Sequence, residues 1–278
     1  MTFAESYAAA ARRWPAGTTS LDVPTSFGST HLLTAGPAGA PTVLLLHGGG
    51  ATATAWADLA GELAGRYRLL APDQPGDLGL SGSSRPPRST ADLVSWVAEL
   101  RAALGTGRWH VVGHSAGAHL GLHVALADPD GVRTLTLLDP TAVVAGFSPR
   151  YLVHALPGLL RPTSRRVRRA LAWETGGREL PEAWVDAHVR GATEEARGPV
   201  VRTRRAGAAR LAALSVPTLV VVGGSSRAHD PDRVARRAAA VSGATVVRLA
   251  GATHHTLPLL DAPAVAAALG RHLSSSAD

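Results

Sequence analysis

The residues best suited to chemistry form the pentapeptide Gly113-His114-Ser115-Ala116-Gly117. It follows a short apolar run that ends at Val112, and a helical pattern begins at Gly117. Glycines on both sides of a serine suit a tight strand-to-helix turn, which lifts the serine hydroxyl above the sheet edge. The pattern predicts that Ser115 is a nucleophile at the positive end of a helix.

A serine hydroxyl reacts well only when a base accepts its proton, so a histidine is needed. His254 and His255 follow the last apolar run of the chain, in the segment 251–255. We expect His254 to be the base. His255 is the alternative, because its spacing to the following Leu257-Pro258 suits the role almost as well.

A second glycine-rich segment, His47-Gly48-Gly49-Gly50, follows the apolar run Val43–Leu46. Backbone N–H groups on such a loop can point at the negative oxygen that develops when a serine attacks a carbonyl carbon. We predict an oxyanion hole made by the N–H groups of Gly49 and Ala116.

These motifs and the late histidine resemble the α/β-hydrolase superfamily, in particular its serine esterase- and thioesterase-like branch with a helical lid. Residues 71–81 are also similar to the A-P-D-x-P-G-x-G-x-S loop of that branch, with one extra residue. The resemblance covers nearly the whole chain and is weakest at 141–210. It implies the order serine, acid, histidine, and it places the base at His254, although Thr253 replaces the usual glycine.

The acid departs from the pattern of the family. After the run Leu219–Val222 the family usually has G-x-x-D, and here Ser226 occupies the position of the aspartate. Asp139, at the end of an earlier apolar run, is where some relatives such as haloalkane dehalogenases carry the acid. Asp230 is the other candidate, although its place before Pro231 also suits a helix N-cap. We expect Asp139; the remaining alternative is that no carboxylate is present, which would favour a dyad or a non-hydrolytic site.

The elements that must position these residues alternate along the chain. Short apolar runs predict strands, at 43–46, 69–71, 111–112, 135–138, 219–222 and 246–249. Periodic segments predict helices, at 55–63, 90–104, 117–127, 231–241 and 263–273. Segments around Leu21 and Leu32 predict a starting hairpin. Such alternation indicates an α/β fold with a mostly parallel sheet and helices on both faces.

Between residues 141 and 210 the alternation stops. No strand-like run occurs there, and five prolines are expected to divide the segment into short helices; they are Pro149, Pro157, Pro162, Pro181 and Pro199. We therefore predict a hydrolase core of residues 1–140 and 211–278 and a helical lid of residues 141–210, which would exclude water from the site.

The charge of the chain is concentrated in the same segment. The whole sequence has 28 basic residues, all Arg, and 21 acidic residues, a formal net charge of +7; residues 141–210 hold 13 Arg and six acidic residues. Most of these Arg side chains are expected on a solvated face. The alternative is a site for an acyl-carrier domain or a CoA thioester.

Composition excludes several other classes. The absence of Cys excludes disulfides, thiolate metal sites and a cysteine nucleophile, and the absence of Lys excludes a phosphate-binding P-loop. His119 and His123 have helical spacing but no third ligand at suitable spacing, so we expect no metal and no cofactor. We also expect no nucleic-acid binding, no membrane span and a cytoplasmic location, because no groove-reading motif, long apolar run or secretory signal is evident.

The sequence therefore predicts a serine hydrolase that cleaves an ester or thioester of a small molecule with a largely apolar acyl group. A non-hydrolytic enzyme of the same fold, such as a lyase, cyclase, C–C hydrolase or acyltransferase, is the alternative, because the usual acid is missing. A ligand-binding protein is the third possibility, and the intact motifs argue against it.

Overall fold

The computed structural model describes residues 1–105, 107–195, 198, 201, 203–241 and 243–274. Eight strands form one sheet in the order β1-β2-β4-β3-β5-β6-β7-β8. The strands are β1 (Thr19–Thr25), β2 (Gly28–Ala35), β3 (Thr42–Leu46), β4 (Arg68–Pro72), β5 (Trp109–His114), β6 (Val132–Leu138), β7 (Thr218–Gly223) and β8 (Ala244–Leu249). β2 pairs antiparallel with both β1 and β4, and all other pairs are parallel, as predicted.

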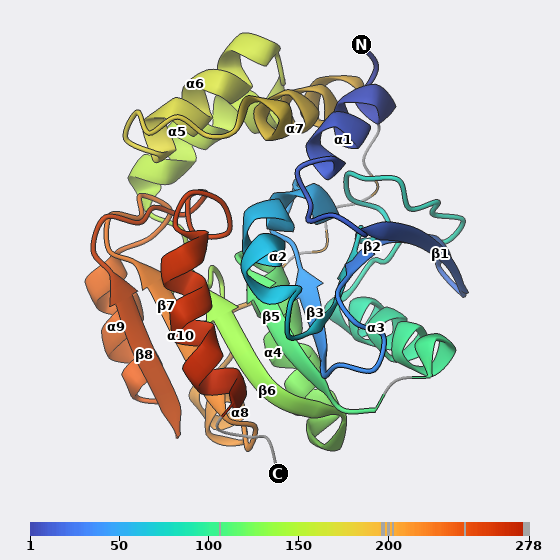
Figure 1. Ribbon diagram of the computed structural model, residues 1–278. Helices are drawn as coiled ribbons and strands as arrows, with labels where there is room; N and C mark the ends of the chain where they lie inside the picture. Colours follow the sequence, from blue (N-terminus) through green and yellow to red (C-terminus); the bar gives the residue numbers. More distant parts are fainter. Residues whose placement is uncertain (106, 196–197, 199–200, 202, 242, 275–278) are drawn as a thin grey trace.

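Helices cover both faces of the sheet (Figure 1). On one face lie α3 (Thr90–Leu104), α4 (Ala116–Ala127) and α9 (Pro231–Ala239); on the other lie α2 (Ala57–Leu63) and α10 (Ala262–Ser274). Successive residues of the central strands alternate between the two cores, so that Leu44 packs with α3 and α4 while Val43 and Leu45 pack with α2 and α10. Strands buried on both faces explain the continuous apolar runs.

Three helices follow β6 and form a helical insertion, defined as residues 149–194: α5 (Pro149–Leu160), α6 (Ser164–Glu174) and α7 (Glu182–Glu194). They lie at one end of the sheet (Figure 1). A short helix, α8 (Ala208–Ala212), precedes β7. Val167, Leu171 and Trp184 of the insertion form a small apolar cluster with Ala55 and Leu259 of the rest of the chain.

The prolines of the insertion were expected to divide it into short helices, and not all of them do so. Pro149 begins α5, Pro162 separates α5 from α6, and Pro181 is the N-cap of α7, but Pro157 lies inside α5 without ending it. Pro199 lies outside the described residues. The helices are consequently longer than five proline breaks would allow.

An N-terminal helix, α1 (Phe3–Ala11), was not among the predicted elements. Thr2 and Glu5 form a capping box at its start, which is a sequence signal for a helix. α1 packs against α7, and Figure 1 shows the two helices side by side. Within the described residues, no helix is both long and apolar enough to cross a membrane.

Candidate active site

Ser115 lies at the turn between β5 and α4, with φ 53° and ψ −113°. This left-handed backbone is strained for a residue with a Cβ and is typical of functional turns. The flanking residues must be glycines because other backbone atoms lie where their Cβ atoms would be. A Cβ on Gly113 would lie 2.2 Å from the carbonyl oxygen of Gly117, and one on Gly117 would lie 2.0 Å from that of Leu46. The turn therefore has the geometry that the pentapeptide predicts.

Asp139 lies just beyond β6, fully buried, and is paired with His254. Its Oδ2 lies 2.6 Å from Nδ1 of His254. Asp230, the other candidate acid, is exposed and accepts a hydrogen bond from the backbone N–H of Arg233 as the N-cap of α9. The structure thus brings Asp139, and not Asp230, to the histidine.

Four groups surround the carboxylate of Asp139. Gly223 N–H donates to Oδ1 at 3.0 Å, and Ser226 donates its hydroxyl to Oδ2 at 2.7 Å. His229 Nε2 lies 3.0 Å from Oδ1, and His254 contacts Oδ2. Burial raises the pKa of Asp139, but the hydrogen bonds and charges of His229 and His254 outweigh burial and hold this pKa well below its usual range. Ser226, at the position where the family usually has aspartate, is thus hydrogen-bonded to Asp139, the residue that follows β6.

The same cluster is the group of described residues that could hold a metal ion, since ligand atoms of Asp139, His229 and His254 lie within 4.8 Å of one another. A carboxylate offers about four lone-pair sites. Gly223 N–H, the Ser226 hydroxyl and His254 are hydrogen-bonded to the carboxylate, and His229 Nε2 lies 3.0 Å from Oδ1. Two of its oxygen contacts are therefore made by groups that are not metal ligands, the Gly223 N–H and the Ser226 hydroxyl.

The second histidine, His255, has a different partner. Its Nδ1 lies 2.8 Å from Oε2 of Glu174, a buried residue at the end of α6. The Glu174 carboxylate also accepts the backbone N–H groups of His254 at 2.8 Å and His255 at 3.1 Å. Burial raises the pKa of Glu174, but the hydrogen bond and charge of His255 and the charge of His254 outweigh it and lower the pKa to about 2. Glu174 therefore joins the helical insertion to the histidine loop.

Three further side chains were not recognised as site residues from the sequence: Thr141, Glu174 and His229. Thr141 is buried, and its Oγ1 lies 3.1 Å from Oγ of Ser115. Within the described part of the chain, the Ser115 hydroxyl is bonded to Thr141 and not to His254. No local motif marks these residues, because each reaches the site only through the fold.

The glycine loop lies beside Ser115. A Cβ on Gly48 would lie 3.3 Å from Cβ of Ser115, and one on Gly49 would lie 3.7 Å from Cβ of Ala116. His47 fixes this loop, since its Nδ1 lies 2.9 Å from the carbonyl oxygen of Gly48 and its Nε2 accepts the Gln74 N–H at 3.0 Å. Gly49 and Ala116, predicted to form the oxyanion hole, are thus neighbours.

The loop at 71–81 has a structural role. Asp73 is fully buried and accepts the backbone N–H groups of Ala53 at 2.7 Å and Leu80 at 2.8 Å. Ser81 donates its hydroxyl to the carbonyl oxygen of Asp73 at 2.7 Å. These bonds hold the loop against the segment that follows the glycine loop.

The other histidines near the turn are structural in their contacts. His114 Nε2 lies 2.9 Å from the carbonyl oxygen of His254, and burial keeps the pKa of His114 well below its usual value, so the ring is neutral. His119 Nε2 lies 3.0 Å from the carbonyl oxygen of Arg204, and its ring packs on that of His123.

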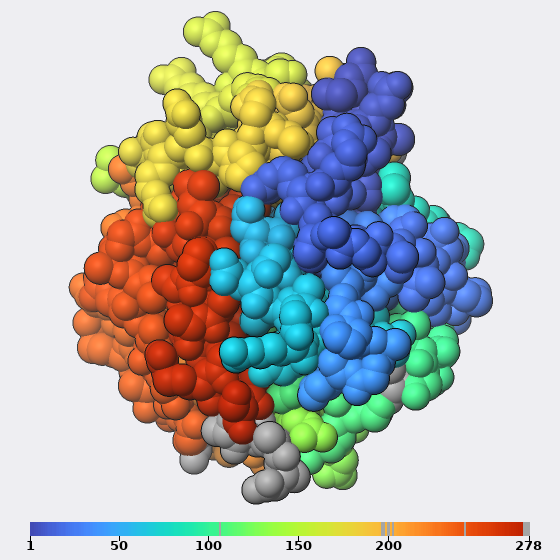
Figure 2. Space-filling model, in the orientation of Figure 1, coloured from blue at the N-terminus to red at the C-terminus, as the bar shows by residue number. Residues whose placement is uncertain are grey.

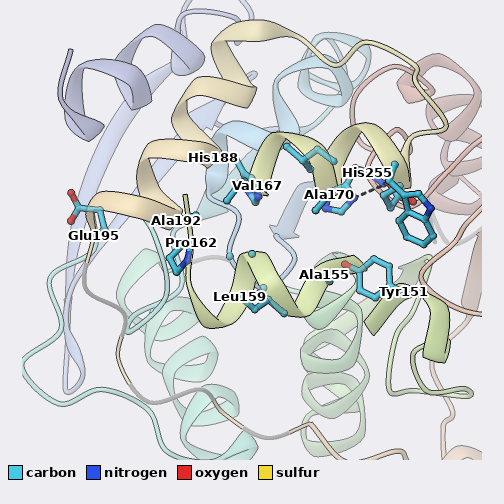
Figure 3. A pocket seen from close by; sticks show the side chains of 16 residues that line it. Tyr151, Ala155, Leu159, Pro162, Val167, Ala170, His188, Ala192, Glu195 and His255 are labelled. Atoms are coloured by element: carbon cyan, nitrogen blue, oxygen red, sulfur yellow. Dashed lines mark hydrogen bonds and ion pairs between the residues drawn. The ribbon is translucent and has the colours of Figure 1, made fainter. Parts of the chain in front are cut away.

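Ser115 and His254 line a cleft of about 490 Å³, together with Gly49, Thr141 and Tyr151. A second cavity of about 320 Å³ lies between the helical insertion and the glycine and histidine loops. It shares six lining residues with the cleft: Gly49, Gly50, Tyr151, Leu159, His188 and His255. Figure 3 shows this cavity, with Tyr151, Ala155 and Leu159 on one side and Val167 and Ala170 on the other. Its lining is mostly apolar and includes small side chains, so it could receive an apolar chain.

The chain belongs to the alpha/beta hydrolase family, whose pattern matches residues 43–269. It is similar to carboxylesterase YbfK of Bacillus subtilis, at 28% identity over 63% of this chain and 58% of that protein. It is also similar to the lipase LipV of Mycobacterium tuberculosis, at 35% identity over 57% of this chain and 61% of LipV.

These sequence alignments span less than two thirds of the relatives' length. Two solved structures share the fold over nearly the whole chain. Naproxen esterase of Bacillus subtilis superposes with a TM-score of 0.87, covering 96% of this chain and 95% of that one, at 24% identity. Carboxylesterase CesB (YbfK) of the same organism superposes with a TM-score of 0.89, covering 96% and 95%, at 22% identity.

Proposed function

We propose that this protein is a serine carboxylesterase that cleaves a small-molecule ester, or a thioester, with a largely apolar acyl group. The observation that carries the proposal is the 2.6 Å contact between His254 Nδ1 and Asp139 Oδ2, in a cleft that also contains Ser115 at its strained turn. The carboxylesterases among the relatives support the hydrolytic interpretation.

In the proposed reaction, Ser115 Oγ attacks the acyl carbon and His254 Nε2 accepts the hydroxyl proton. The Asp139 carboxylate stabilises the imidazolium that forms and holds its tautomer. The N–H groups of Gly49 and Ala116 bind the negative oxygen of the tetrahedral intermediate. The intermediate collapses to acyl-Ser115, and the alcohol leaves with the proton from His254. His254 then accepts a proton from water, whose oxygen attacks the acyl carbon. The second tetrahedral intermediate releases the carboxylic acid as His254 returns the proton to Ser115 Oγ.

Before the attack, the Ser115 hydroxyl must turn its hydrogen toward His254, and where Ser115 is the donor to Thr141 that hydrogen bond must break. Its hydrogen bond to Thr141 Oγ1 is a neutral pair, which contributes about 0.5–1.5 kcal/mol net. Rotation about the Cα–Cβ bond of Ser115 toward His254 need cost no more free energy than this one hydrogen bond. A general base typically raises the rate 10²- to 10⁴-fold, which is a larger effect. The resting contact is therefore compatible with a reactive serine.

The helical insertion supplies the apolar part of the site. We propose that residues 141–210 act as a lid on a core of residues 1–140 and 211–278, and that the acyl group enters the cavity between α5 and α6. Val167, Leu171 and Ala170 line that cavity and carry no polar side-chain atoms. Such a lining favours hydrocarbon over charged groups.

A fluorophosphonate probe, which labels activated serines, tests the proposal. We expect rapid labelling of the wild type, none of Ser115→Ala, and slow labelling of His254→Ala and Asp139→Asn. Asp230→Asn is the matched control, since Asp230 is exposed and caps α9; it should label at the wild-type rate. A folded wild type that resists the probe, or equal slowing by the two Asp→Asn changes, would contradict the assignment.

A further inference from the structure

Helix α5 has the composition of a buried helix but is not buried. Apart from Arg150 and His154, its side chains are aliphatic, aromatic or proline, and none of its 12 residues is buried. A helix that is apolar nearly all round is normally covered by other parts of a protein. Helix α5 therefore presents an apolar surface for which the described part of the chain provides no cover.

This surface accounts for most large apolar side chains that are exposed among the described residues. Six of the ten lie between residues 147 and 160: Phe147, Leu152, Val153, Leu156, Leu159 and Leu160. Val153 is 67% exposed and Leu160 is 76% exposed. Isolated exposed apolar residues need no explanation, but a contiguous cluster marks an interaction site. We call these six residues the apolar face.

The apolar face continues into the cleft. Phe147, Leu152 and Leu159 are at least 38% exposed and also line the cleft that holds Ser115. Leu159 lines the second cavity as well. The apolar face therefore shares three of its six side chains with the cleft that holds Ser115.

Positive charge borders the apolar face. Residues 140–173 contain six Arg and no Asp or Glu. Arg168 alone among these six forms an ion pair with another described residue, reaching Asp186 and Glu182. Arg150, Arg161, Arg165, Arg166 and Arg169 are exposed. Figure 2 shows that this part of the chain forms one end of the molecule, at the top of the view.

We propose that the apolar face and its Arg border dock this protein on a lipid surface that carries anionic headgroups. An amphipathic helix that buries apolar side chains between lipid chains, with Arg beside it, binds anionic membranes in this way. The Arg border matches anionic headgroups, and the apolar face matches the hydrocarbon beneath them. Docking does not depend on hydrolysis; delivery of a lipid-borne ester to Ser115 rests on the proposed function.

Flotation with vesicles tests the docking. Wild-type protein is mixed with vesicles of phosphatidylcholine, or of phosphatidylcholine with phosphatidylglycerol. We expect binding to the anionic vesicles, at least tenfold weaker binding to the neutral ones, and loss of binding as salt rises. Val153→Glu/Leu160→Glu should weaken binding at least tenfold. Arg165→Ser/Arg166→Ser should weaken it about 25-fold, or about fivefold for each Arg beside an anionic surface.

Matched controls separate docking from general effects of charge. Leu21 is 37% exposed on β1, so Leu21→Glu tests an added carboxylate elsewhere. Arg233→Ser/Arg236→Ser removes two exposed Arg from α9. Both control variants should bind as the wild type does. None of the substituted residues lines either cavity, so fluorophosphonate labelling of every variant should stay at the wild-type rate.

The proposal is overturned if the wild type does not bind anionic vesicles, or if the controls lose as much binding as the α5 and α6 variants. It is also overturned if the apolar face instead forms a dimer that Val153→Glu dissociates, or binds an acyl-carrier protein and not vesicles. Vesicle binding without labelling of Ser115 would refute the proposed function and leave the docking intact.

Discussion

The position of the catalytic acid can be tested by moving it. Asp139→Asn removes the charge next to His254, and Ser226→Asp offers a carboxylate from the neighbouring loop. Two hydrogen bonds, of 2.7 and 2.6 Å, link Ser226 Oγ to Asp139 and Asp139 to His254. In Ser226→Asp, the carboxylate oxygens lie one bond farther from the backbone than Oγ of Ser226 does. In the double variant, the side-chain amide introduced at position 139 could donate to this new carboxylate.

The expected magnitudes follow from these contacts. Asp139→Asn should lower kcat about 10⁴-fold, the cost of losing a carboxylate that holds the imidazole tautomer. The double variant should recover at least 10² of that loss. Ser226→Asp alone places two carboxylates side by side in a buried site, where like charges disfavour each other's ionisation. It should therefore lower both Tm and kcat.

Hydrolysis of p-nitrophenyl butyrate, with Tm measured on every variant, gives the complete double-mutant cycle. Ser226→Ala is the control for loss of the hydroxyl, which removes one of the four donors around Asp139. A double variant that folds but is no faster than Asp139→Asn would show that position 226 cannot supply the acid. Full activity of Asp139→Asn would refute the assignment of Asp139 as the orienting acid.

Three further predictions concern the insertion and the serine. Glu174→Gln should lower the free energy of unfolding at neutral pH by roughly 3 kcal/mol. The reason is that the fold lowers the pKa of Glu174 from 4.5 to about 2, and each pKa unit corresponds to about 1.4 kcal/mol. The stabilisation by the Glu174 carboxylate is complete above pH 4.5 and disappears as the pH falls toward 2. The free energies of unfolding of wild type and variant, measured by urea denaturation, should therefore converge near pH 2. A difference that stays constant with pH would contradict this prediction. Thr141→Val should raise the rate of fluorophosphonate labelling about two- to tenfold, as Ser115 loses a competing partner; a tenfold fall would assign Thr141 a direct role. Ala170→Phe should lower kcat/KM for p-nitrophenyl decanoate about 15-fold relative to p-nitrophenyl acetate. The larger side chain would displace two methylenes of the acyl chain from the cavity, at about 0.8 kcal/mol each. Equal losses for both esters would place the acyl chain elsewhere.

Local patterns were sufficient to predict the core of the fold. The six predicted strands all occur, each longer than its apolar run, because polar residues such as Arg68 and Thr218 extend the pairing beyond that run. The turn at Ser115 could be predicted because both glycines are needed for backbone contacts within a few residues of the serine.

The rest of the site depends on contacts between distant segments. Glu174 lies 80 residues before His254, and Asp139 lies 115 residues before it. The sequence identified Asp139 as a candidate but gave no physical reason to exclude Asp230, since an N-cap and a catalytic acid use the same side chain. In the sequence, Ser226 indicates only that the usual acid is missing, whereas in the fold its hydroxyl donates to the acid that β6 provides.

The bonds that Glu174 makes have a consequence for motion. One buried carboxylate at the end of α6 accepts the backbone N–H groups of both His254 and His255, so moving α6 away would break both hydrogen bonds to the histidine loop. Movement of α6 and alignment of His254 are then thermodynamically linked, and by reciprocity each must shift the equilibrium of the other. A ligand that favours the position of α6 seen here would therefore also favour the position of His254 seen here.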